Sequence, residues 1–210
     1  DALYFVKRQA IWLCLGILAM VLGSRIPPSK FKKYTPLCYT ITLVLLILTL
    51  IIGFVGNGAK RWISIGPITI QPSEIAKLTM VMMLSKYFDE HEQRATSPKN
   101  RKESFLYGTL FPFIIMIIPI LLVMLQKHLS CIIILGLIGI LLIVLSGAGL
   151  RYLGGFCALG ALGVSYIAFF TDYTKDRITV WRDPESYKLT GGWQTLQGLM
   201  AIGSGGVFGK

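Results

Sequence analysis

Charge is scarce in this sequence, and acidic charge is the scarcest. Of 210 residues only 10 are Asp or Glu, against 21 Lys or Arg, and there are 2 His. The 4 cysteines lie in apolar segments without a CxxC or Cys/His spacing, so neither a disulfide framework nor a zinc site is indicated. With 54% hydrophobic residues and a mean hydropathy of +0.65, the composition argues against a water-soluble domain and for a membrane protein.

Long segments without charge predict where the chain crosses a membrane. A bilayer core about 30 Å thick is spanned by roughly 20 apolar residues in a helix. Five uncharged runs approach or exceed this length, and a sixth apolar segment carries only Glu74, Lys77 and a terminal Lys86. The sequence therefore predicts an all-α, polytopic membrane helical bundle with six spans, over residues 5–24, 34–56, 74–88, 105–126, 128–148 and 152–171.

Two prolines, Pro112 and Pro119, fall inside the fourth predicted span. Each removes a backbone N–H donor, which membrane helices tolerate where neighbouring groups satisfy the freed carbonyl. We therefore expect a kink in this span.

Basic residues indicate the orientation of the chain. Residues 25–33 hold four cations and no acid, residues 86–103 hold five cations, and Arg151 marks a third turn on the same side. The short loops on the opposite side hold five in all. Because basic residues collect in cytoplasmic loops, residues 25–33 and 86–103 are predicted to be cytoplasmic, and residues 56–73 and 172–210 extracytoplasmic. The same rule accounts for the net charge of +11, so no nucleic acid partner is expected.

The segment 172–210 is longer and richer in charged and aromatic residues than a connector requires, which makes it a candidate for part of an active site. Its last part, TLQGLMAIGSGGVFGK, predicts a re-entrant or interfacial helix. The chain opens with DALYFVKRQ and without Met, so we expect an internal piece of a longer protein.

The stretch GAKRWISIGPITIQPSEIAK places charges at the start of an apolar helix. Glu74 and Lys77 are three residues apart, share one helix face and are predicted to pair, while Ser73 is predicted to cap the helix that follows Pro72. A charge in the bilayer costs about 2.5–3.5 kcal/mol even on a lenient scale. Such residues usually face a bundle interior or a water-filled cavity, which favours a functional role.

Lys60 and Arg61 lie nearby and complete a group of three cations with Lys77. Guanidinium and ammonium groups match phosphate oxygens, so the group suits an anionic headgroup such as a diphosphate. The alternative is that Lys60 and Arg61 are interfacial cations, with Trp62 as an aromatic anchor.

The same stretch resembles the SEDS family (shape, elongation, division and sporulation), which contains FtsW, RodA and SpoVE. The family pattern GA-x-RWI…GP…QPSE-x-x-K is present from Gly58 to Lys77. Further matches are YFVKRQ at 4–9, RITVWRDP at 177–184, and the segment from Gln194 to Lys210, so the resemblance covers the whole chain. It implies a membrane bundle of about ten spans in the cytoplasmic membrane of bacteria.

The resemblance implies a glycosyltransferase that polymerises lipid II into peptidoglycan strands for division, elongation or sporulation. The 4-hydroxyl of an incoming GlcNAc would attack C1 of the MurNAc at the growing end, and undecaprenyl diphosphate would leave. The implied partners are a class B penicillin-binding protein and other membrane proteins of the divisome or elongasome. No cofactor motif is evident, and a divalent cation at the diphosphate is an open option.

In this scheme Arg61 and Lys77 contact the diphosphate or substrate, and Glu74 fixes Lys77. Asp183 is a candidate for loop folding or for positioning the acceptor. The full set of candidate substrate-binding residues is Lys60, Arg61, Gln71, Ser73, Glu74 and Lys77, and the candidates in the long loop are Trp181, Arg182, Asp183, Gln194 and Gln197.

Two departures limit what the family implies here. Many members have an acidic residue in a QPD-L-x-T motif, where this chain has His128 within QKHLSC. The presumed catalytic aspartate of the family lies beyond Lys210, so we expect the catalytic base outside this chain and the fragment alone to be inactive.

Two other functions remain open from the sequence. One is a flippase that uses the charges as a pathway for lipid II. The other is a non-catalytic scaffold that recruits a penicillin-binding protein. Charges at the outer interface rather than in mid-span favour the polymerase over the flippase, and a scaffold has little use for Glu74 and Lys77 in an apolar helix.

Overall fold

A computed structural model describes residues 2–56, 59–66, 68–96, 99–148, 152–170 and 172–206. Gly58, Pro67, Arg151 and residues 207–210, which carry parts of the sequence motifs and of the charge pattern, lie outside the described residues. The chain divides into two units, Asp1–Leu153 and Gly154–Lys210.

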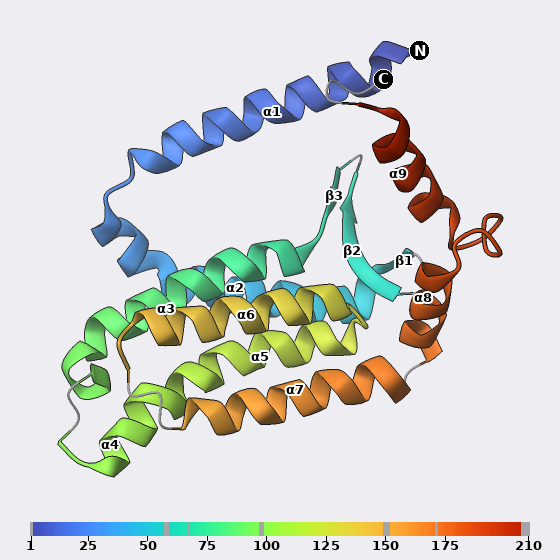
Figure 1. The fold of residues 1–210 in the computed structure, drawn as a ribbon. Coiled ribbons are helices and arrows are strands. Elements are labelled where there is room, and N and C mark those ends of the chain that lie inside the picture. The colour runs from blue at the N-terminus through green and yellow to red at the C-terminus, as the bar shows by residue number, and fades with distance from the viewer. Residues whose placement is uncertain are drawn as a thin grey trace. The chain divides into compact units, whose positions relative to one another are not determined.

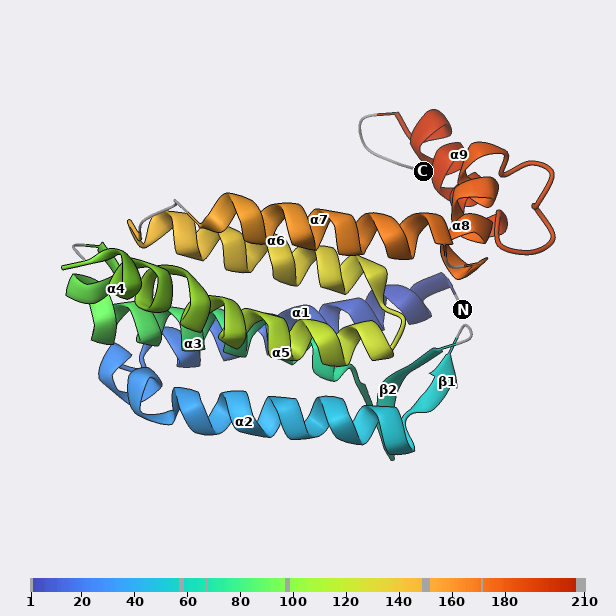
Figure 2. The ribbon, with the colours of Figure 1, turned by 90° about the horizontal axis from the view of Figure 1, so that it is seen from below.

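The first unit is built mainly from helices. α2, α3, α5 and α6 pack side by side, with α3 contacting each of the other three (Figures 1 and 2). The helices of this unit are α1 (Ala2–Ser24), α2 (Pro28–Ile52), α3 (Pro72–Thr96), α4 (Arg101–Phe105), a π-helical turn (Leu106–Leu110), α5 (Phe111–Leu125) and α6 (Leu129–Leu145). This is the helical membrane bundle predicted from the uncharged runs.

Helices occupy the segments predicted as spans, with shifted ends. α2 begins at Pro28, inside the predicted loop 25–33, since proline suits the first turn of a helix. α3 continues to Thr96 because polar residues end an apolar run without ending a helix. In the described part of the chain, three helical stretches are long and apolar enough to cross a membrane: Leu3–Ser24, Pro28–Ile52 and Arg101–Leu125. Leu129–Leu145 and Leu153–Gly163 are shorter apolar helices, and the count of six spans stays a prediction.

A three-stranded antiparallel sheet between α2 and α3 was not predicted. β1 (Phe54–Gly56) pairs with β2 (Ala59–Ile65), which pairs with β3 (Ile68–Ile70). Residues 53–56, assigned to the second span, are therefore not helical. Isoleucine and threonine suit strands, and Gly66 at φ 62° allows the turn between β2 and β3. We call the end of the bundle where these strands lie the sheet end (Figures 1 and 2).

Two tyrosine hydroxyls satisfy the carbonyls that the prolines leave without a donor. In α5, Pro119 cannot donate to Ile115, and the Tyr39 hydroxyl of α2 donates to that carbonyl at 2.6 Å. In the π-helical turn the residue five positions on would donate, so the carbonyl of Tyr107 faces Pro112. The Tyr87 hydroxyl of α3 donates to it at 3.0 Å. The prolines thus tie α5 and its preceding turn to α2 and α3.

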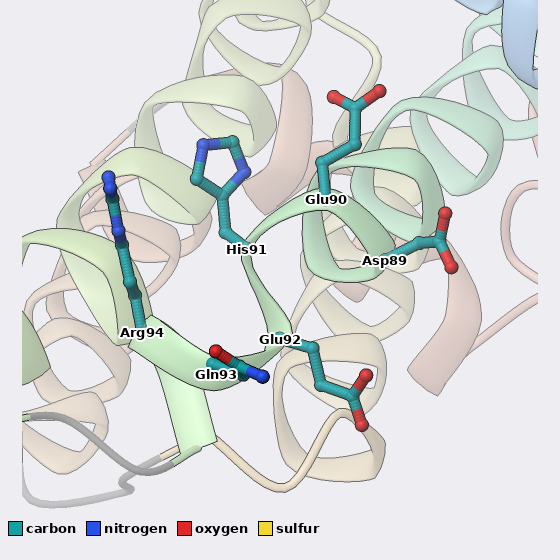
Figure 3. A pocket seen from close by; sticks show the side chains of 6 residues that line it. All are labelled: Asp89, Glu90, His91, Glu92, Gln93 and Arg94. Atoms are coloured by element: carbon teal, nitrogen blue, oxygen red, sulfur yellow. The ribbon is translucent and has the colours of Figure 1, made fainter.

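α3 is interrupted near its C-terminal end. His91 has non-helical angles (φ −122°, ψ 18°), and its ring stacks on Tyr87 on one side and Tyr107 on the other. Arg94 lies over the Tyr107 ring and donates to its hydroxyl at 2.9 Å. Around the break lies a hollow of about 470 Å³, lined by residues 89–94 (Figure 3). The stacked rings hold the break in place.

The described residues of the second unit form the helices α7 (Leu153–Phe170), which begins at the boundary between the units, α8 (Asp172–Arg182) and α9 (Trp193–Ser204). A turn-rich segment joins α8 to α9, and Gly192 is buried in it. A Cβ at Gly192 would overlap the carbonyl of Pro184. The close approach of these two parts of the segment therefore requires glycine at position 192. The predicted interfacial helix corresponds to α9, whose residues Trp193, Leu199 and Ile202 are exposed.

The tyrosine bonds predict a specific loss of stability. Tyr39→Phe leaves the partly buried carbonyl of Ile115 without a donor and should destabilise the fold by about 1–3 kcal/mol. Tyr34→Phe is the matched control, because Tyr34 lies on the same helix, is 52% exposed and has no hydrogen bond among the described residues. Unfolding in detergent micelles would measure both, and equal stabilities of the two variants would contradict the assignment.

The contact between α5 and α6 predicts that alanine at two glycine positions of α6 will change the stability by different amounts. A Cβ at Gly139 would overlap the sulfur of Met116, which is 5% exposed and has little room to move. Gly139→Ala should therefore destabilise the protein by about 1–3 kcal/mol through overpacking. Gly136→Ala, on the same helix with open space around it, should be neutral or slightly stabilising in the same unfolding measurement. The reverse order would show that this packing is wrong.

Candidate functional site

Lys60 and Arg61 both bind helix C-termini. The Lys60 ammonium donates to the carbonyl of Ile51, at the end of α2, at 3.3 Å. The Arg61 guanidinium donates through Nε to Gln126 at 3.4 Å and through Nη2 to the carbonyl of Lys127, just beyond α5. Successive residues of a strand point to opposite faces, so neighbours in β2 can reach two different helices.

These contacts are electrostatically favourable, because the last carbonyls of a helix lack donors and carry partial negative charge. They give Lys60 and Arg61 a structural role, distinct from both the substrate contact and the lipid-interface role considered from the sequence. Whether either cation also binds substrate stays a prediction.

The first turn of α3 differs from the prediction at Ser73. The helix begins at Pro72, so Gln71, not Ser73, is the residue before it, and the Gln71 carbonyl accepts from the N–H of Glu74 at 3.0 Å. The Ser73 hydroxyl is fully buried and has no hydrogen-bond partner among the described residues. The expectation that Ser73 caps α3 is therefore wrong, because Pro72 already fits the first helical position.

Glu74 and Lys77 form the predicted ion pair. The Lys77 Nζ lies 2.7 Å from Oε2 of Glu74, and the two side chains are 25% and 56% exposed, respectively. Glu74 also stands in the first turn of α3, where the helix dipole favours a negative charge. The Glu74 end of the pair is the more open one, and a ligand can approach Lys77 from there.

His128 lies near the Glu74–Lys77 pair, a proximity that the sequence did not predict. It lies in the short turn between α5 and α6, and its Nδ1 accepts from the N–H of Cys131 at 3.1 Å, which caps α6. Its Nε2 lies 3.2 Å from the side-chain amide nitrogen of Gln71. Burial lowers the pKa of His128, and the charge of Arg61 acts in the same direction. The sequence feature that could have indicated this proximity is the position of His128 in the short turn QKHLS between two predicted spans.

The structure thus brings together Gln71, Glu74, Lys77, His128 and Arg61 at the sheet end. Arg61, Glu74 and Lys77 are all near enough to act on the charge of His128. We call Gln71, Glu74, Lys77 and His128 the α3 cluster. It combines one cation, one carboxylate, an amide and an imidazole.

The other candidates belong to the second unit. Trp181 and Arg182 end α8, and Gln194 and Gln197 lie on α9. Asp183 follows α8, and its Oδ1 accepts from the N–H of Ser186 at 3.2 Å. Hydrogen bonding from the Ser186 side chain, and next from this N–H, lowers the pKa of Asp183. The contact fits the role in loop folding considered for Asp183, and substrate roles for these residues stay predictions.

The contacts of the cations predict different consequences for stability. Arg61→Ala removes charged hydrogen bonds to the end of α5 and should cost about 1.5–3 kcal/mol. Lys77→Ala removes a partly exposed ion pair, which is worth at most about 1 kcal/mol. Thermal unfolding in detergent would compare the two, and a larger loss for Lys77→Ala would contradict the helix-end role of Arg61.

Comparisons with known proteins agree with this architecture. Residues 1–210 match the family of FtsW, RodA and SpoVE, described as "Cell cycle protein". The chain is 32% identical over 207 residues to the peptidoglycan glycosyltransferase MrdB of Escherichia coli K12, covering 98% of this chain and 54% of that protein. It is 35% identical over 209 residues to the probable peptidoglycan glycosyltransferase FtsW of Wigglesworthia glossinidia brevipalpis, covering 100% and 53%, respectively. The chain thus spans about half the length of these relatives.

Solved structures share the fold. The rod shape determining protein RodA of Thermus thermophilus matches with a TM-score of 0.61 and 25% identity, over 74% of this chain and 49% of that one. A chain from a peptidoglycan synthase complex, described as coordinating polymerization and crosslinking, matches with a TM-score of 0.67 and 27% identity, over 96% and 57%. With the family match over the whole length, the chain belongs to the SEDS family of FtsW, RodA and SpoVE.

Proposed function

We propose that the full-length protein is a lipid II polymerase, and that the Glu74–Lys77 pair binds the diphosphate of the lipid-linked substrate. The observation that carries the proposal is this ion pair, which lies open at the start of α3 in a helix bundle of the SEDS fold. Relatives that match this whole chain are named peptidoglycan glycosyltransferases.

The three cations differ in the groups that they bind. Lys60 and Arg61 bind backbone carbonyls at helix ends, whereas Lys77 binds the exposed side chain of Glu74. An ammonium has three donors, so Lys77 can keep one bond to Glu74 and offer others to phosphate oxygens. Glu74 holds Lys77 in place until the substrate arrives.

In the proposed reaction the bond between C1 of MurNAc and the diphosphate oxygen breaks. A new bond forms from C1 to the 4-oxygen of the acceptor GlcNAc, whose proton passes to a carboxylate base supplied by the rest of the protein. Lys77 would stabilise the negative charge that develops on the leaving undecaprenyl diphosphate.

A divalent cation at the diphosphate stays a prediction. In the described part of the chain no group of three or more His, Cys, Asp or Glu side chains comes together. In the α3 cluster Glu74 is the one carboxylate, and it pairs with Lys77. A metal would therefore be held mainly by the diphosphate itself.

The proposed location is the cytoplasmic membrane of a bacterium. Residues 25–33 and 86–103 would face the cytoplasm, and residues 56–73 and 172–210 the outside, which puts the sheet end at the outer face. A class B penicillin-binding protein is the proposed partner, together with other membrane proteins of the divisome or elongasome. A similar chain is part of a peptidoglycan synthase complex.

Polymerisation by variants of the full-length protein would test the proposal. The purified protein and its penicillin-binding partner would be incubated with fluorescent lipid II, and glycan products separated on a gel. Lys77→Ala should reduce the polymer by roughly tenfold or more, because a charge contact at the leaving group is lost. Lys86→Ala is the matched control, since it removes a Lys–Glu pair from the same helix far from the sheet end.

Other outcomes would favour other functions. Full polymerisation by a well-folded Lys77→Ala protein would exclude the pair as the diphosphate site. No polymer from the wild-type complex, together with lipid II flipping in liposomes, would favour the flippase. Neither activity, with retained binding of the penicillin-binding protein, would favour the scaffold.

A further inference from the structure

His128 links two parts of the sheet end through its two ring nitrogens. Nδ1 accepts from the backbone N–H of Cys131 at 3.1 Å, and Nε2 lies 3.2 Å from the side-chain amide of Gln71. Gln71 directly precedes α3, and Cys131 lies in the first turn of α6. The imidazole therefore connects the starts of the two helices.

The Cys131 contact fixes the position of the proton on His128. A backbone N–H only donates, so Nδ1 must be unprotonated, and the neutral ring carries its proton on Nε2. Nε2–H is then a donor, and the amide atom that faces it must be the oxygen of Gln71. This orientation turns the NH₂ group of Gln71 away from His128.

We propose that His128 is a positioning residue, which fixes the Gln71 amide so that its NH₂ group is presented to the anionic substrate beside Lys77. The inference rests on the proposed function. Gln71 and Lys77 flank the first turn of α3, where Glu74 already holds the ammonium. Two donors of fixed direction would then meet the diphosphate, which lowers the entropic cost of binding it.

The surrounding charges determine how this arrangement responds to pH. Arg61 of β2 and Lys77 of α3 disfavour protonation of His128, whereas Glu74 of α3 favours it. Burial adds to the first two, and the pKa of His128 lies below its usual value of 6.5. Lys127 in the same turn and Cys131 of α6 are the other ionisable neighbours along the chain.

Protonation would put a hydrogen on Nδ1, opposite the N–H of Cys131. The side-chain cap on α6 would be lost. Repulsion between the two hydrogens would then displace the ring that positions Gln71. Since the native pKa is lowered, the neutral form predominates at pH 6.5 and above and is lost as the pH falls through the native pKa. Polymerisation should decline over the same range.

Two substitutions separate capping from positioning. In His128→Asn the short amide can still accept from the N–H of Cys131, as asparagine does at helix N-termini, but it cannot reach Gln71. In His128→Gln the longer amide can reach Gln71 but is a poor cap. We expect His128→Asn to fold normally and polymerise roughly tenfold more slowly. His128→Gln should unfold at a lower temperature but polymerise faster than His128→Asn below that temperature.

The pH profile and a double substitution give readouts that a capping role alone would not change. His128→Asn should lack the acid decline that the wild type shows below pH 6.5, whereas Gln71→Glu should move this decline to higher pH, because a carboxylate beside the ring stabilises the imidazolium. Gln71→Ala combined with His128→Asn should be no slower than either alone, since both remove one contact.

Failure of this inference is distinguishable from failure of the proposed function. If the wild type polymerises and His128→Asn matches it at every pH, positioning by His128 is excluded while the polymerase stands. If the wild type does not polymerise, the ¹⁵N signals of labelled histidine, assigned against His128→Asn, decide the matter. An unprotonated Nδ1 and a protonated Nε2 that responds to Gln71→Ala would support the inference, and the opposite tautomer would overturn it.

Discussion

Backbone carbonyls without helical donors are the constraint on which this bundle depends, because an apolar surrounding offers them no water. Pro119 and Pro112 leave two such carbonyls within one helical stretch, and the hydroxyls of Tyr39 and Tyr87 bind them. The ends of α2 and α5 leave others, which Lys60 and Arg61 bind. At each of these prolines and helix ends, the free carbonyl accepts a hydrogen bond from a side chain of a neighbouring element. These hydrogen bonds help to hold the bundle together.

The same constraint shapes the candidate site. Because β2 supplies cations to two helix ends, the turn that follows α5 is held beside the start of α3. That places His128 against Gln71, while Lys77 pairs with the side chain of Glu74. The three cations that suggest one anion site in the sequence thus have two kinds of partner in the structure, backbone carbonyls for Lys60 and Arg61 and a carboxylate for Lys77.

Much of the fold could be predicted from the sequence. Uncharged runs located the long helices, and the spacing of three between Glu74 and Lys77 predicted their ion pair. The sheet was missed because its isoleucines lie in short segments that continue the apolar pattern around them. The predicted cap at Ser73 is wrong because α3 starts at Pro72, two residues before the first helical position that a cap at Ser73 requires.

What the sequence by itself determined is the family and the class of bundle, since length, charge pattern and motif order are properties of the chain alone. It also determined which ionisable groups exist near the start of α3. Only the tertiary structure decided what each group binds. Arg61 binds the end of α5 and His128 contacts Gln71, and in both pairs the partners are more than fifty residues apart in the sequence. Such contacts depend on which helix ends pack together, and a local pattern of residue types does not specify this packing.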